Sequence, residues 1–198
     1  MNPIIRLADE HDAEQICSIY APFCESTAVS FEVTAPTIAE MQERIRKVLS
    51  QYPWLVCQAG EKVIGYAYAC AHRERAAYRW SVDVAVYIAE GRRRSGIGRA
   101  LYTSLFKFLV LQGYYKAYAG VTLPNPGSVG LHEAMGFTPV GVYRGVGYKS
   151  GAWRDVGWWE MSLQPERAGP DEPRSVRVIQ QSAEWQDAMR TGLPYLRF

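Results

Sequence analysis

A β-strand, a basic glycine-containing loop and an amphipathic helix follow one another between residues 80 and 113. The segment 80–88, WSVDVAVYI, alternates valine and isoleucine with other side chains at a period of two, which is typical of a strand with two different faces. The segment 97–112 carries apolar residues at helical spacing, and Gly113 stands where a helix commonly ends. The loop between them must therefore lead directly from a sheet into a helix.

The loop 92–100, RRRSGIGRA, combines concentrated positive charge with two glycines. The first turn of a helix offers free backbone N–H groups and the positive end of the helix dipole, and glycine lets an anion approach that backbone closely. Gly96 and Gly98 are therefore predicted to cradle a phosphate. Further charge comes from Arg93, Arg94 and Arg99. Taken alone, the loop is explained equally well as a basic turn without a ligand, since it matches neither the dinucleotide nor the Walker pattern.

The rest of the chain predicts a mixed α/β fold. A strand and a helix are expected over 4–23, with a cap at Asp9 or Asp12 and an end or kink at Pro22. A helix over 37–53 begins with the capping-box pair Thr37 and Glu40. Strands, a short helix and a long hairpin are expected over 54–59, 63–71, 115–122, 125–137 and 139–163. Because two hairpins interrupt the alternation of strands and helices, a mixed sheet is favoured over a doubly wound parallel one.

The composition changes at residue 164. The segment QPERAGPDEPR carries three prolines and several charges, as expected for a linker, and a strand and a short helix are expected after it. We therefore predict a principal domain over residues 1–163 and a C-terminal extension over 164–198.

Composition also excludes several classes of protein. The net charge of +2 is too balanced for a surface that grips nucleic acid throughout. No apolar signal core and no uncharged run of about 20 residues is seen, so a cytoplasmic protein without a membrane segment is expected. The four cysteines are expected to be reduced, and no metal is expected, because His11, His72 and His132 lack ligand spacing.

In this context the Arg-x-x-Gly-x-Gly loop resembles the pyrophosphate-binding motif of the GNAT acyltransferases, which hold acetyl-CoA. The second signature of that family, an Asn, a short helix and Gly-Phe after a strand, is matched by Asn125, Gly136 and Phe137. The segments YPWLV, LYTSLFKFLVLQG, LPNPGSVGLHEAMGF and YKSGAWRDVGWW resemble the branch of phosphinothricin and methionine sulfoximine acetyltransferases. The resemblance covers about residues 5–163.

The resemblance implies a GNAT fold, α/β (α+β), with a mixed, mostly antiparallel sheet flanked by helices. It implies acetyl-CoA as the cosubstrate, with its thioester arm bonded to backbone groups of the strand before the loop. The residues implied to contact acetyl-CoA are Val86, Ile88, Arg93, Arg94, Ser95, Gly96, Ile97, Gly98, Arg99, Asn125 and Ser128.

The catalytic residues implied by the resemblance are Asp83 and His132. The branch usually has a glutamate where this chain has Asp83. The resemblance implies that the carboxylate at this position takes a proton from the attacking amine. The alternative is that Asp83 only forms hydrogen bonds with neighbouring strands or with the substrate. His132 would protonate the leaving thiolate, and a packed helix residue is the alternative. The acceptor pocket is implied to contain Phe31, Arg75, Tyr78 and Trp80. Arg75 would pair with a carboxylate or phosphinate, unless it is an exposed loop charge.

The expected enzyme is an acetyl-CoA-dependent N-acetyltransferase that acts on the α-amino group of a small amino acid such as phosphinothricin or methionine sulfoximine. Such an activity would detoxify these herbicides and antibiotics, and the resemblance implies a homodimer formed in part by the hairpin after residue 138. Three alternatives stay open: another amine acceptor, such as a different amino acid, a polyamine or a protein N-terminus; an acyl-CoA-binding protein without turnover; and a nucleic-acid-binding module built on Arg92–Arg94. Overall charge balance disfavours the last of these.

Overall fold

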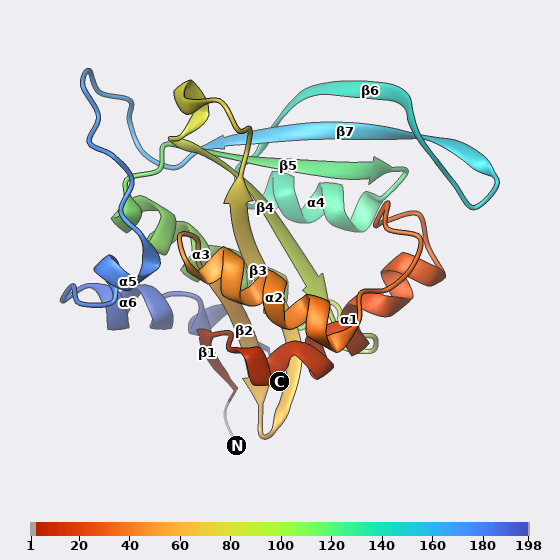
Figure 1. Cartoon of the computed structure of the whole chain (residues 1–198), viewed down its shortest axis with the longest axis horizontal. Coiled ribbons are helices and arrows are strands. Elements are labelled where there is room, and N and C mark those ends of the chain that lie inside the picture. The colour runs from red at the N-terminus through yellow and green to blue at the C-terminus, as the bar shows by residue number, and fades with distance from the viewer. Residues whose placement is uncertain (1–2, 198) are drawn as a thin grey trace.

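One sheet of seven strands organises the part of the chain that the computed structural model describes, residues 3–197 (Figure 1). Its order is β1-β2-β3-β4-β5-β7-β6. The strands are β1 (Ile4–Leu7), β2 (Trp54–Ala59), β3 (Lys62–Ala71), β4 (Ser81–Ile88), β5 (Lys116–Leu123), β6 (Thr138–Lys149) and β7 (Ala152–Ser162). Within these residues only β4 and β5 pair in parallel, which confirms the mixed, mostly antiparallel sheet.

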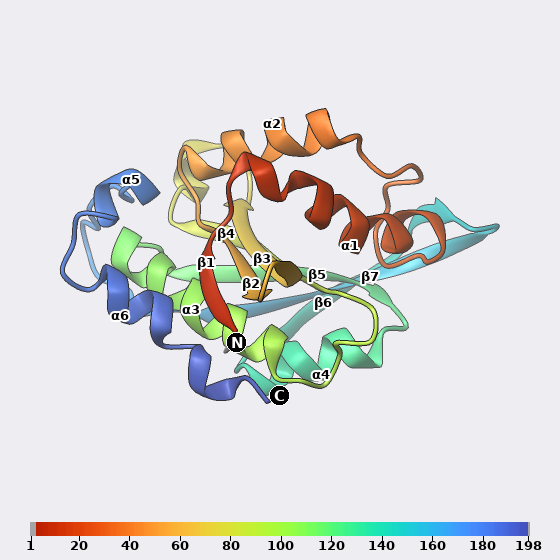
Figure 2. The same ribbon diagram turned by 90° about the horizontal axis from the view of Figure 1, so that it is seen from below.

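Helices cover both faces of this sheet (Figure 2). Helices α1 (Ala13–Glu25) and α2 (Ile38–Leu49) lie on one face, and α3 (Ile97–Gln112) and α4 (Pro126–Ala134) lie on the other. The alternation of β4 explains how it serves both layers. Val82 and Val84 belong to the core beneath α3, while Tyr87 packs against the core beneath α1 and α2. Asp83 shares the Tyr87 face, because side chains two or four apart along a strand point the same way.

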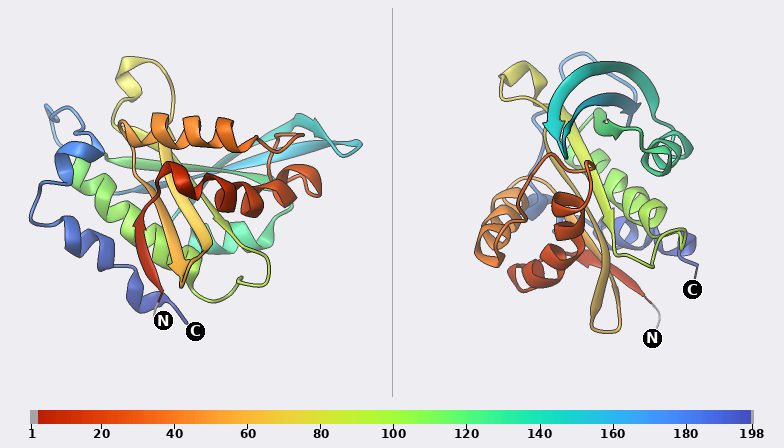
Figure 3. Two further views of the ribbon diagram at one scale, coloured as in Figure 1. Left: turned by 60° about the horizontal axis from the view of Figure 1, so that its bottom comes forward. Right: turned by 90° about the vertical axis from the view of Figure 1, so that its right-hand side faces the viewer.

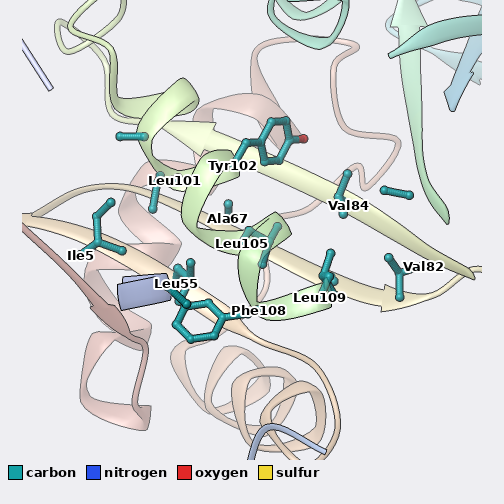
Figure 4. Packing of buried hydrophobic residues seen from close by; sticks show 14 of the residues in the cluster. Ile5, Leu55, Ala67, Val82, Val84, Leu101, Tyr102, Leu105, Phe108 and Leu109 are labelled. Atoms are coloured by element: carbon teal, nitrogen blue, oxygen red, sulfur yellow. The ribbon is translucent and has the colours of Figure 1, made fainter. Parts of the chain in front are cut away.

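The core beneath α3 shows why this helix forms where periodicity predicts it (Figure 4). Leu101, Leu105, Phe108 and Leu109 are all completely buried. Each such side chain contributes about 1.5–3 kcal/mol when it is fully removed from water. Gly113 ends the helix in the left-handed conformation, with φ of 96°, as predicted.

Local sequence signals are confirmed at one helix and corrected at another. The capping box of α2 is present, with the hydroxyl of Thr37 accepting from the Glu40 N–H and the Glu40 carboxylate accepting from the Thr37 N–H. Pro22 does not end α1, which continues to Glu25, so the predicted end is wrong and the alternative of a kink stays a prediction. Proline removes one backbone N–H, but the next turn still closes through the bond from the Ser26 N–H to the Pro22 carbonyl at 3.0 Å.

The segment after residue 163 folds back along α3 (Figure 3). It contains α5 (Val176–Ile179), α6 (Trp185–Arg190) and a 3-10 turn, η3 (Leu193–Tyr195). A helix thus stands where the sequence predicts a strand, because Val176 and Ile179, three residues apart, are both buried in the core beneath α3. The predicted division into a domain over residues 1–163 and an extension over 164–198 stays a prediction. Residues 1, 2 and 198, at the ends of these ranges, lie outside the described residues.

Candidate active site

A cleft opens where β4 and β5 separate. Their pairing is limited to three residues of each strand and ends with Asp83 opposite Tyr118. Beyond that pair, β4 continues to Ile88 and β5 to Leu123 along diverging paths (Figure 1). The resulting cleft has a volume of about 690 Å³. Ten of the eleven residues predicted to contact acetyl-CoA line it, namely Val86, Ile88, Arg93, Arg94, Gly96, Ile97, Gly98, Arg99, Asn125 and Ser128.

One end of the cleft is built to receive an anion. Gly96 is the N-cap residue of α3 in the left-handed conformation, with φ of 78°, and the backbone N–H groups of the next residues lack acceptors within the helix. Arg92, Arg93 and Arg94 line the same cleft. The helix dipole and three guanidinium groups together favour a polyanion such as a diphosphate. Ser95 stands outside the lining, and its hydroxyl donates to the Arg92 carbonyl at 2.8 Å.

The C-terminal tail holds this loop from behind. The Arg197 N–H donates to the Ser95 carbonyl at 2.9 Å, and the Arg99 guanidinium lies over the Tyr195 ring at 4.3 Å. The carbonyl oxygen of Tyr195 lies so near Gly96 that a Cβ there would be 1.8 Å from it. The conformation of the anion-binding loop is thus fixed by glycine and by the tail.

Asn125 has two roles at the opposite wall of the cleft. Its side-chain carbonyl accepts from the Ser128 N–H at 3.1 Å and so caps α4. It also lines the cleft, together with Ser128. Asn125 can therefore cap α4 and also make the predicted contact with acetyl-CoA.

Asp83 lies where the pairing of β4 with β5 ends. It forms a pair with His72, which sequence reasoning missed. The His72 Nδ1 and the Asp83 Oδ1 are 2.6 Å apart. The His72 ring stacks on Tyr118 at 4.2 Å and meets Tyr78 edge-on at 5.8 Å. Burial raises the pKa of the Asp83 carboxyl, and the hydrogen bond from His72 opposes that rise. The one available signal was register: β3 ends at Ala71, one residue before His72, and Cys70 pairs with Asp83.

His132 lies in the packing between α3 and α4. It is 4% exposed, its Nδ1 donates to the Ser128 carbonyl at 2.8 Å, and its Nε2 accepts from the Tyr102 hydroxyl at 3.0 Å. Burial lowers its pKa. Both ring nitrogens are occupied, so these contacts favour packing over the predicted role as an acid for the thiolate, which stays a prediction.

His132→Asn is expected to lower the free energy of unfolding by about 1–3 kcal/mol, because the buried Tyr102 hydroxyl loses its acceptor. It should change kcat for acetyl transfer less than threefold. Thermal unfolding and steady-state kinetics on one preparation measure both. A tenfold lower kcat at an unchanged Tm would instead support the acid role.

The four predicted acceptor contacts are not all brought together. Tyr78 lies beside His72, and the Phe31 ring packs directly on Gly147 of the β6–β7 hairpin. Trp80 donates its indole N–H to the Asp171 carbonyl at 2.9 Å, in the linker of the tail. Arg75 is exposed at the start of the 3-10 turn η2 (Ala76–Tyr78).

Two further expectations concern metals and membranes. Among residues 3–197, no group of three or more His, Cys, Asp or Glu side chains is placed to hold a metal ion. No helix in the same part of the chain is long and apolar enough to cross a membrane. All four cysteines are free thiols.

Comparisons with known proteins agree with this architecture. A family model described as an acetyltransferase (GNAT) domain matches residues 5–158. A phosphinothricin N-acetyltransferase of Streptomyces viridochromogenes is 38% identical over 177 residues, covering 89% of this chain and 94% of that protein. An L-methionine sulfoximine/L-methionine sulfone acetyltransferase of Pseudomonas aeruginosa is 31% identical over 172 residues, covering 86% of this chain and 100% of the relative.

Solved structures show the same fold. A phosphinothricin acetyltransferase from Sinorhizobium meliloti, in complex with AcCoA, superposes with a TM-score of 0.79 at 32% identity, covering 86% of this chain and 96% of that one. An acetyltransferase structure from Salmonella typhimurium, with its cofactor acetyl-CoA, gives a TM-score of 0.82 at 30% identity and covers 86% and 99% of the two chains.

Proposed function

This chain belongs to the GNAT acetyltransferase family, and from that membership we propose that it moves the acetyl group of acetyl-CoA to the α-amino group of a small amino acid such as phosphinothricin or methionine sulfoximine. The observation that carries the proposal is the cleft itself. It is lined by β4 residues beyond the last β4–β5 pair, Asp83–Tyr118, and by the basic N-terminus of α3. The names of the relatives refer to amino acids of this type, phosphinothricin and methionine sulfoximine.

The residues present fit acetyl-CoA. Its diphosphate would lie on the N–H groups of the first turn of α3, beside Arg93 and Arg94. Beyond Asp83, β4 has no partner strand on its β5 side, so backbone groups of Val86 and Ile88 on that side are available to the amides of the pantetheine arm. Acetyl-CoA supplies an activated acetyl thioester. The chain itself must hold the carrier, position the amine and take a proton from it.

The proposed acceptor site lies around Asp83, with Phe31, Arg75, Tyr78 and Trp80 as the predicted contacts. Support is uneven among them. Tyr78 lies against the His72–Asp83 pair, and Phe31 is fixed against Gly147. Arg75 offers a guanidinium that would pair with the acceptor's carboxylate in bidentate fashion. The indole N–H of Trp80 is engaged by the tail and the Arg79 guanidinium lies over its ring at 5.3 Å, so its contribution would come from the rest of the ring surface.

We also propose that the enzyme works in the cytoplasm as a homodimer that detoxifies such amino acids. The exposed surface of the β6–β7 hairpin supports the dimer, because it presents several apolar side chains to solvent: Val140, Val142, Tyr143, Val146, Tyr148 and Trp153. A second copy of the chain would cover them. Light scattering after gel filtration should give twice the mass of the chain, and Val142→Glu should reduce it to the monomer.

A panel of amine acceptors with thiol release as readout tests the activity. We expect kcat/KM for phosphinothricin or methionine sulfoximine to exceed that for polyamines and peptide N-termini by at least tenfold. The reverse order would support another acceptor. Tight binding of CoA without transfer to any amine would support an acyl-CoA-binding protein instead.

A further inference from the structure

We propose that His72, oriented by Asp83, is the group that takes the proton from the amine of the acceptor. The inference rests on the proposed acetyl transfer, because it names the proton acceptor of that reaction. Asp83 then acts through His72 as a positioning residue. The carboxylate is already engaged by the imidazole at 2.6 Å, so the nitrogen of the pair that faces away from it is the free base.

The hydrogen bond fixes which nitrogen carries the proton. An ionised carboxylate only accepts hydrogen bonds, so the neutral His72 ring must donate from Nδ1. The lone pair then resides on Nε2. Across residues 3–197, no hydrogen bond joins Nε2 to another group, in contrast to His132, whose two ring nitrogens are both engaged. His72 therefore presents a base in one defined tautomer.

The His72 ring is held where the pairing of β4 with β5 ends. It bonds Asp83 and stacks on Tyr118, and these two residues form the last pair before β4 and β5 separate. Tyr78 and Trp158 contact its edges, at 5.8 and 6.1 Å between ring centroids. Its side chain is 12% exposed, which restrains the ring while leaving part of it accessible.

Acidity favours imidazole over carboxylate in this role. An α-ammonium group has a pKa near 8, an imidazole near 6.5 and an aspartate near 3.9 in water. For unperturbed groups, transfer to an imidazole is unfavourable by roughly 1.5 pKa units, against roughly 4 for an aspartate. Burial raises the pKa of Asp83 and narrows this difference. Proton acceptors matched to the operating pH are the effective general bases. A carboxylate behind the ring also stabilises the imidazolium that forms.

The proton balance is simple. One ammonium proton passes to Nε2 and then to bulk water. The neutral nitrogen attacks the acetyl carbon, and as the C–N bond forms and the C–S bond breaks, its second proton neutralises the departing thiolate. The products are the amide, the CoA thiol and one released proton, and the His72–Asp83 pair returns to its starting state.

Other titratable groups around the pair do not explain a change between pH 5 and 8. Cys70 faces Asp83 from β3, and burial raises its pKa to about 11. Burial likewise raises the pKa of Tyr118, which has Glu160 beside it on β7. Arg73 contributes fixed positive charge near Asp83, and Tyr78 contacts the ring.

The test compares pH profiles of kcat/KM for acetyl transfer in matched variants. The kcat/KM of the wild type should fall on the acid side of the pH profile, because the base becomes protonated there. His72→Gln keeps a donor toward Asp83 but cannot take a proton, so kcat/KM should fall about 10²–10⁴-fold, and its remaining pH dependence should follow the ionisation of the acceptor amine alone, with a pKa near ~8. Asp83→Asn should also lower activity, because the amide no longer holds the proton on Nδ1. His11→Gln, at an exposed histidine, is the control and should leave both unchanged.

Two further measurements separate catalysis from structure. Asp83→Glu in the His72→Gln background should recover at least tenfold, because the longer carboxylate reaches the amine directly. The NMR signals of the His72 ring should show the proton on Nδ1 in the wild type and a changed tautomer in Asp83→Asn. If the wild type is active and His72→Gln keeps kcat/KM within threefold with an unchanged pH profile, this inference is wrong while the proposed function stands. A wild type that acetylates no amine overturns the proposed function, and this inference with it.

Discussion

Gly96→Ala is expected to lower the affinity for CoA about 100-fold, which corresponds to about 2.8 kcal/mol. A Cβ at this position would lie 1.8 Å from the carbonyl oxygen of Tyr195 and 2.9 Å from its carbonyl carbon. The tail cannot move aside freely, because Gly192 also packs against the Ala100 carbonyl, where a Cβ would be 1.9 Å away. The first turn of α3 must shift instead, and its N–H groups are the ones proposed to hold the diphosphate. Isothermal titration with CoA measures the loss.

Two glycine variants serve as controls. Gly91→Ala introduces the same left-handed strain at φ of 75°, but nothing lies within 4 Å of its new Cβ, so it should cost about 1–2 kcal/mol of stability and little affinity. Gly98→Ala meets only the end of the Leu131 side chain at 3.0 Å, and its loss of affinity should be intermediate. Equal CoA affinities for Gly96→Ala and Gly91→Ala would contradict the expectation.

Most of the fold could be predicted from the sequence because local sequence patterns indicate its helices and strands. The alternation in 80–88, the apolar stripe of 97–112 and the capping box at Thr37 are each decided within one or two turns of chain. The exceptions follow the same logic. Tertiary packing on α3, which no local pattern encodes, makes a helix of Val176–Ile179 where β-branched residues predict a strand.

In the candidate site, too, residues that are close in sequence were predicted and a pair brought together by the fold was missed. The basic glycine-containing loop is contiguous, so its residues were predicted together, and all of those predicted except Ser95 line the cleft. The His72–Asp83 pair is not contiguous; it depends on the register of β3 against β4 and on the loop that follows β3. His132 illustrates the converse, since family position alone suggested catalysis while its two hydrogen bonds are those of a packed residue.

Lys149 joins the hairpin to the loop that carries Phe31. It is 6% exposed at the end of β6, and its ammonium donates to three backbone carbonyls at short distance, those of Cys24 at 2.5 Å, Ser30 at 2.6 Å and Glu32 at 2.7 Å, with the Phe23 carbonyl farther away at 3.5 Å. Three such bonds match the three donors of an ammonium group. The loop after α1 is thereby fixed against the hairpin, and with it one wall of the proposed acceptor site.

Lys149→Met is expected to lower the free energy of unfolding by about 3 kcal/mol, since methionine fills a similar volume and leaves the carbonyls of Cys24, Ser30 and Glu32 without this donor. For a chain of 198 residues this corresponds to a Tm lower by about 6–12 °C. KM for the amine should rise at least fivefold as Phe31 loses its fixed position, while KM for acetyl-CoA, whose predicted contacts lie on β4, the loop before α3 and the start of α4, should change less than twofold. Calorimetry and two-substrate kinetics measure these effects.

Lys107→Met is the matched control, because Lys107 is an exposed lysine on α3, and it should change the unfolding free energy by no more than about 0.5 kcal/mol. The split between the two KM values is the decisive part of the experiment. Lower stability with both KM values unchanged would mean that Lys149 supports the fold alone. A parallel rise in both would mean that the whole cleft, and not one wall, depends on the three hydrogen bonds.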